Sequence, residues 1–114
     1  MLFKPEHVAP ILEGRKTQTR RVWSRCRVKV GAVHKCYTRP AWVSPPGESF
    51  ASVKVLEVRQ EALGSISEAD AHAEGYENVA AYLAAFARIN NDKLKHSGFD
   101  AELPVYVVTF EVAP

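Results

Sequence analysis

The spacing of apolar and polar side chains predicts a first helix near the start of the chain. It begins at Pro5, which favours an opening helical turn, and ends at Gly14, with Val8, Ile11 and Leu12 on one face. The polar segment that follows Gly14 therefore comes directly after this helix.

Two further helices are predicted in the second half of the chain. A short one follows the N-cap residue Ser67, carries acidic residues in its first turn, where the helix dipole favours them, and stops at Gly75. A longer one spans about 79–89, because apolar residues recur there at the 3.6-residue period: Val79, Tyr82, Leu83, Phe86 and Ile89.

Alternation of apolar and polar residues predicts four strands, over residues 18–23, 31–38, 50–58 and 105–112. In the third strand the apolar positions change parity. Val53 and Val55 share one face, whereas Leu56 and Val58 share the other, which predicts a β-bulge or a bend near Leu56.

The helices are too few for a series of βαβ units, so the pattern indicates an α+β fold around a small curved or barrel-like sheet, with the helices outside it. A chain of 114 residues has the size of one domain, and we expect a single domain over 1–114. The strand at 18–23 is polar on both faces, which predicts that it borders a groove.

Charge is polarised along the chain. Residues 1–47 carry ten Lys or Arg and two Glu, a balance of +8, whereas residues 48–114 carry five Lys or Arg and eleven acids, a balance of −6. Residues 14–47 contain no Asp or Glu but nine cations: Arg15, Lys16, Arg20, Arg21, Arg25, Arg27, Lys29, Lys35 and Arg39. Such a stretch either solvates its cations individually or receives an anionic partner, and the density of charge favours the partner.

Two thiols with nine residues between them, Cys26 and Cys36, are too few for a zinc site and do not form a C-x-x-C redox pair, and the four histidines show no ligand spacing. We therefore expect no metal and no other cofactor. The N-terminal residues form no signal-like apolar run and no segment is apolar enough to span a bilayer, so we expect a cytoplasmic protein with no membrane partner. The sequence gives no indication of oligomeric state.

The segment 14–21 concentrates cations with hydroxyl and amide side chains, and it predicts a site for an anion or a nucleotide. Its side chains, together with Arg39, suit phosphate contacts, and Trp42, set between prolines, suits stacking on a base. Trp23 and Tyr37 fit the core better. The candidate nucleic-acid contacts are Arg15, Arg20, Arg21, Arg39 and Trp42.

Four segments together resemble ASCH domains, which have a PUA-like β-barrel fold. They are Leu2-Phe3-Lys4; Ile11-Leu12-x-Gly14-Arg15-Lys16-Thr17-x-Thr19-x-Arg21; Glu68-x-Asp70-Ala71-x-x-Glu74-Gly75-Tyr76; and residues 105–111. The resemblance spans nearly the whole chain and is weak between residues 22 and 67. It implies a small PUA-like barrel with flanking helices, and a cleft that binds RNA or a nucleoside.

One departure from the commoner family signature, Gly-x-Lys-x-x-Glu-x-Arg, bears on chemistry, because this chain has Thr19 where that signature has glutamate. Small members that resemble the chain more closely are amidohydrolases that remove the acetyl group from acetylated cytidine. Their catalytic lysine, threonine and glutamate match Lys16, Thr19 and Glu74 here.

The chemistry of this set is coherent. Neighbouring arginines are expected to lower the pKa of Lys16, which would then act as a general base, with Thr19 as nucleophile and Glu74 as proton shuttle. Arg21 would stabilise an oxyanion. Because Lys16 and Thr19 are three residues apart, the chain must turn near Thr17 or Gln18 to bring them to one substrate.

Alternatives remain for the same residues. Lys16 and Arg20 are equally suited to plain phosphate contacts, and Glu74 to an ion pair with Arg21. The sequence therefore supports an RNA- or nucleoside-binding domain with a basic cleft, and alternatively an amidohydrolase acting on N-acetylated cytidine. A metal-dependent ribonuclease is less favoured, since residues 14–47 lack carboxylates.

Overall fold

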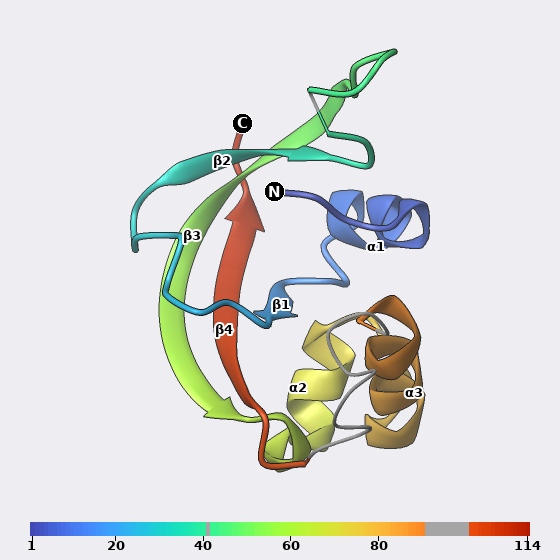
Figure 1. The fold of residues 1–114 in the computed structure, drawn as a ribbon, viewed down its shortest axis with the longest axis vertical. Helices are drawn as coiled ribbons and strands as arrows, with labels where there is room; N and C mark the ends of the chain where they lie inside the picture. Colours follow the sequence, from blue (N-terminus) through green and yellow to red (C-terminus); the bar gives the residue numbers. More distant parts are fainter. Residues whose placement is uncertain (41, 91–100) are drawn as a thin grey trace.

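The computed structural model describes residues 1–40, 42–90 and 101–114 and shows a curled sheet flanked by short helices (Figure 1). The elements are η1 (Pro5–His7), α1 (Val8–Leu12), β1 (Gln18–Arg21), β2 (Val33–Tyr37), β3 (Ser49–Ala62), η2 (Leu63–Ser65), α2 (Glu68–Ala73), α3 (Val79–Ile89) and β4 (Pro104–Val112). The α+β class is confirmed, and every predicted helix and strand is present.

The four strands form one antiparallel sheet in the order β1-β4-β3-β2. This is an open, curled sheet, and among the described residues β1 and β2 remain its two edges, so the barrel is only partly formed. The N-terminal segment spans the gap between them. Leu2 forms a bridge with Tyr37 of β2, while Arg21 of β1 donates through Nη2 to the Leu2 carbonyl over 2.7 Å.

The predicted bulge in the third strand is confirmed. Pairing between β3 and β4 shifts between Val55 and Glu57, and Leu56 is exposed. β3 continues to Ala62, beyond the predicted end at residue 58, because its second half pairs with the first half of β4. The bulge reverses the parity of the strand, so residues 53 and 55 and residues 59 and 61 face opposite sides of the sheet.

The two sides of the sheet pack against separate apolar clusters. On one side, α2 and α3 cover a cluster built around Leu63, Ile66, Ala71, Tyr82, Phe86, Val105 and Val107. On the other, the N-terminal segment and α1 cover Phe3, Ile11, Cys36, Val53 and Phe110. The predicted core role of Trp23 and Tyr37 is met only partly, since both are half-buried, with Trp23 stacked on Tyr106 at 5.8 Å between ring centroids.

The end of α2 meets the start of β1. The Ser67 hydroxyl accepts from the Asp70 amide at the N-cap, as predicted, and Gly75 adopts a φ of 96°, a conformation that glycine allows without strain. The Thr17 amide donates to the Ala73 carbonyl over 2.7 Å. This contact places the last turn of α2 beside the segment that precedes β1.

No helix within the described ranges is long and apolar enough to cross a membrane.

Candidate functional site

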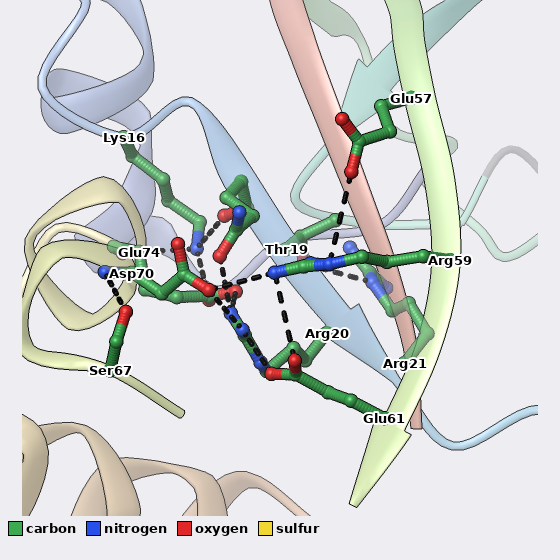
Figure 2. A network of polar contacts seen from close by, with 11 residues as sticks. Lys16, Thr19, Arg20, Arg21, Glu57, Arg59, Glu61, Ser67, Asp70 and Glu74 are labelled. Carbon is green, nitrogen blue, oxygen red and sulfur yellow. Dashed lines mark hydrogen bonds and ion pairs between the residues drawn. The ribbon is translucent and has the colours of Figure 1, made fainter. Parts of the chain in front are cut away.

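A buried ion pair between Lys16 and Glu74 forms the centre of the candidate site (Figure 2). The two residues are only 2% and 3% exposed. Lys16 Nζ donates to Glu74 Oε1 over 2.9 Å, to the Glu74 carbonyl over 3.0 Å and to the Gln18 carbonyl over 2.9 Å. All three protons of an ammonium group are therefore matched by acceptors.

Arg20 extends the pair into a network. Its guanidinium is fully buried and contacts Glu61 over 2.6 Å, Asp70 over 3.0 Å and Glu74 Oε2 over 3.1 Å, and it also donates to the Gln18 side chain. Burial opposes the charge of Arg20, but the hydrogen bond that it donates to Glu61 and the charge of Glu74 outweigh burial and raise the pKa of Arg20.

Sheet register explains why this network forms. Arg20 lies opposite Val107 of β4, which lies opposite Arg59 of β3, so the three residues form one row on the face toward α2. Arg59 Nη2 binds Asp70 over 2.7 Å at the outer end of the network. The β3 bulge is what turns Arg59 to this face.

Thr19 and Arg21 project from the other face of β1. Arg21 Nε donates to Thr19 Oγ1 over 3.2 Å, and the Arg21 guanidinium lies 4.7 Å from the centroid of the Phe3 ring. These contacts fix both side chains against the N-terminal segment.

A small cavity of about 80 Å³ lies beside β1, which is an edge strand, so side chains from both of its faces line the same space. Its walls come from the N-terminal segment, β1, the end of α2 and the length of α3. The lining residues are Leu2, Phe3, Lys4, His7, Lys16, Thr19, Arg20, Arg21, Glu74, Tyr76, Tyr82, Phe86, Ile89 and Asn90.

Burial lowers the pKa of Lys16, and the charge and hydrogen bond of Glu74 oppose this shift without cancelling it. The direction agrees with the sequence-based expectation, but the main cause differs: desolvation is larger than repulsion from Arg21 and Arg20. Burial therefore favours the neutral amine of Lys16, whereas the contact with Glu74 favours its ammonium form.

His7 forms a second polar contact in the cavity, with Nε2 2.8 Å from the Tyr76 hydroxyl. Burial, with smaller repulsion from Lys16, Arg21 and Arg88, lowers the pKa of His7 from 6.5 to about 4. The imidazole is consequently neutral at pH 7 and contributes no charge to the cavity.

Five of the eight candidate residues line the cavity: Lys16, Thr19, Arg20, Arg21 and Glu74. They meet without a register shift within β1, because Lys16 lies before the strand and its side chain folds back to the Gln18 carbonyl. The expected turn at Thr17 or Gln18 is therefore not needed, because β1 begins at Gln18 and Lys16 lies outside the strand.

Three candidate residues lie outside the cavity. Arg15 is exposed and pairs with Glu13 at 2.6 Å, Arg39 donates to the Pro45 carbonyl, and Trp42 is 82% exposed. These three residues could therefore contact only the part of a ligand that extends beyond the cavity.

The structure shows the ion pairs that two candidate residues form. The guanidinium of Arg20, a candidate nucleic-acid contact, is buried, and its Nη atoms are held by three carboxylates. Glu74 was considered as a partner for Arg21, and it pairs instead with Lys16 and Arg20.

Several cavity and network residues were not identified from sequence. Asp70 was interpreted as a first-turn acid of a helix and as part of the family resemblance, without a role in the site. Glu61 lies beyond the predicted end of its strand, and Tyr82 belongs to a helical pattern that equally suits a core. The resemblance, which includes Asp70 and Tyr76, and the parity change in β3 were the signals that could have pointed to these residues.

Within the part of the chain that the structure describes, no three His, Cys, Asp or Glu side chains are grouped as metal ligands would be.

Comparisons with known proteins locate the fold. No family model matches the chain, and no curated protein matches it by sequence. Among solved structures, the chain is similar to an ASCH domain from Lactobacillus crispatus JV V101, with a TM-score of 0.74 and 16% identity over 92% of this chain and 69% of that one.

Two further solved structures are similar. Protein EF3133 from Enterococcus faecalis V583, described with the family model DUF984, has a TM-score of 0.71 and 18% identity over 95% of this chain and 70% of that one. Hypothetical protein PH0355 has a TM-score of 0.69 and 14% identity over 99% of this chain and 96% of that one. These likenesses support an ASCH-type, PUA-like fold.

We predict strong coupling between Lys16 and Glu74. Lys16→Met is expected to destabilise the protein by about 3 kcal/mol, because it leaves the Glu74 carboxylate buried without one of its partners. Glu74→Gln is expected to lower the free energy of unfolding less in the Lys16→Met variant than in the parent. Urea unfolding of the parent, both single variants and the double variant measures the coupling.

The exposed pair of Arg15 and Glu13 is the matched control, and its coupling in the same cycle is expected to stay below about 1 kcal/mol. Equal coupling for the buried and the exposed pair would show that Lys16 and Glu74 do not depend on each other.

We also predict a pH dependence of stability that originates at His7. Because its folded-state pKa of about 4 lies below the unfolded value of 6.5, the unfolded chain binds more protons between these pH values. Stability is therefore expected to fall as the pH decreases from about 6.5 to about 4, and to fall less in His7→Gln, which does not titrate. Parallel curves for parent and variant in urea unfolding across this window would contradict the assignment.

Proposed function

We propose that this chain, which has the ASCH-type fold, binds a nucleoside whose base edge enters the cavity beside β1. The observation that supports the proposal is the convergence of Lys16, Thr19, Arg21 and Glu74 on one small cavity. Burying a charged pair costs free energy, and apolar residues of similar size would stabilise the fold equally well. A buried pair that lines a cavity is thus more readily explained by recognition or chemistry than by stability.

The size of the cavity limits which part of a ligand can enter. Pockets that enclose a whole drug-sized ligand occupy about 300–1,000 Å³, whereas this cavity measures about 80 Å³. The edge of a single planar ring fits such a space after a small widening. The ribose, and any phosphate or neighbouring nucleotide of an RNA, would then lie outside the cavity.

Polar groups in the cavity suit a nucleobase edge. Glu74 offers carboxylate oxygens that retain lone-pair capacity beyond their contacts with Lys16 and Arg20, and they can accept from an exocyclic amino group. Arg21 and the tyrosine hydroxyls offer donors for ring or carbonyl acceptors.

A second candidate function, hydrolysis of an N-acylated cytidine, is favoured by the presence of Thr19 in the same cavity as Lys16 and Glu74. Thr19 Oγ1 would attack the acyl carbon and give its proton to neutral Lys16. The C–N bond then breaks, and the amino group leaves with a proton delivered through Glu74. Water hydrolyses the resulting threonine ester to free carboxylic acid.

Two contacts are relevant to this chemistry. Burial lowers the pKa of Lys16, which favours the neutral amine that a general base needs. Arg21 already touches Thr19 Oγ1, so its guanidinium lies next to the position where the oxyanion would develop. Lys16 Nζ would have to exchange one of its three present acceptors for Thr19.

The binding proposal predicts affinity for cytidine that changes little between about 50 and 200 mM salt, since the cavity contacts the base rather than a phosphate. A short single-stranded RNA would bind with an affinity that falls steeply over the same range, as phosphate contacts release counterions. Titration calorimetry of the parent, Thr19→Val and the surface control Lys54→Gln measures both. Absence of binding to nucleosides and to RNA would refute the proposal.

The hydrolase proposal predicts that the protein releases cytidine and acetate from N-acetylcytidine. Chromatography of the reaction mixture measures this release. Thr19→Val, which keeps the side-chain shape, and Glu74→Gln are each expected to lower kcat at least about 100-fold. Lys54→Gln, at an exposed residue that does not line the cavity, is expected to keep parental turnover. Unchanged turnover in Thr19→Val would exclude Thr19 as the nucleophile. Absence of turnover by the parent protein would refute the hydrolase proposal and leave only the binding proposal.

A further inference from the structure

Tyr82 lines the cavity and carries an unpaired hydrogen-bonding group. The residue lies on α3 and is 3% exposed, yet its hydroxyl has no hydrogen-bond partner among the residues that the structure describes. Most buried polar groups in folded proteins are paired, because an unpaired one retains its full desolvation cost. An unpaired hydroxyl on a residue that lines a cavity is therefore explained most simply by a partner that arrives with a ligand.

Packing fixes the position of this hydroxyl. The Tyr82 ring lies between Tyr76 and Phe86, at centroid distances of 5.7 and 6.0 Å, and the Arg20 guanidinium carbon lies 5.8 Å from its centroid. Since the carboxylates hold Arg20 in turn, the ring cannot turn freely to find another partner. A group held in this way is suited to selecting among ligands.

The hydroxyl acts as a donor. Burial and the nearby charge of Glu74 raise the pKa of Tyr82, so the phenol stays protonated at any physiological pH. Arg20, which also lines the cavity, has a second buried donor, Nε, that is unpaired among the described residues. This side of the cavity consequently calls for an acceptor on the ligand.

We propose that the Tyr82 hydroxyl donates a hydrogen bond to a carbonyl oxygen of the bound base and so determines which base the cavity accepts. The inference rests on the proposed nucleoside-binding function. With Glu74 accepting from an amino group and Tyr82 donating to a carbonyl, the ligand edge must carry both groups. Adenine lacks the carbonyl and uracil lacks the amino group, whereas cytosine carries both on a single ring that suits the small cavity.

Access requires a small movement. The hydroxyl oxygen is covered in the ligand-free protein, and the side chains of Phe86, Ile89 and Asn90 line the cavity beside Tyr82. The base reaches the hydroxyl by displacing side chains of the last turn of α3, which also widens the cavity to the thickness of a ring.

The test uses Tyr82→Phe, which removes only the hydroxyl. Titration calorimetry is expected to show cytidine binding about tenfold weaker than in the parent, because the base carbonyl is left buried without its donor. The parent is expected to bind 2-thiocytidine about tenfold more weakly than cytidine, since sulfur is a weak acceptor. Tyr82→Phe is expected to bind the two ligands equally.

Two controls separate recognition from structure. Tyr106→Phe removes a tyrosine hydroxyl outside the cavity and is expected to leave both affinities unchanged. The thermal midpoint of Tyr82→Phe is expected to equal or exceed that of the parent, because an unpaired buried hydroxyl is removed.

Cytidine affinity in Tyr82→Phe equal to that of the parent would overturn the inference while leaving nucleoside binding intact. Equal loss of affinity for cytidine and 2-thiocytidine, together with a lowered thermal midpoint, would assign Tyr82 a structural role and also overturn it. Failure of the parent to bind any of the four common nucleosides would refute the nucleoside-binding function itself.

Discussion

The buried contact between Lys16 and Glu74 is the interaction on which both the fold and the cavity depend. It joins the segment before β1 to the last turn of α2. Its two hydrogen bonds, with a third from Lys16 Nζ to the Gln18 carbonyl, offset part of the cost of removing two charges from water. Arg20 then ties Glu74 to Asp70 and Glu61, so the same carboxylate connects the sheet with the helix layer. The groups that would meet a ligand are thus the groups that hold the two layers together, which gives them little freedom to drift from their positions.

This arrangement divides the cations of the chain into two classes. Lys16 and Arg20 are neutralised inside the protein by acids from the second half of the sequence, so part of the charge polarity seen along the chain disappears on folding. The exposed cations at Arg25, Arg27 and Lys29 are not absorbed in this way, and they line a separate surface groove. Charge counted along a sequence therefore overstates the charge available to a partner, because pairing across the fold is invisible to the count.

The sequence predicted elements well where one periodicity dominates. α3 has the predicted bounds, and the bulge in β3 was visible because alternation breaks there. The sequence also indicated Lys16, Thr19 and Glu74 as one site, but through a family resemblance rather than through residue spacing. What could not be predicted depends on contacts between distant segments. Glu61 belongs to a strand only because β4 pairs with it, Arg20 is buried only because three remote acids surround it, and the Tyr82 hydroxyl is unpaired only in the context of its neighbours.

The bulge in β3 has a consequence for comparing relatives of this chain. It adds one residue to a strand, so that Val53 and Val55 serve an apolar core while Arg59 and Glu61, at the same parity, serve an ionic network on the opposite face. A relative without the extra residue would need its charges at positions of the other parity to build the same network. An alignment that places no gap at Leu56 would then match its buried residues to charged ones here, and this one position can lower the apparent identity between proteins of the same shape.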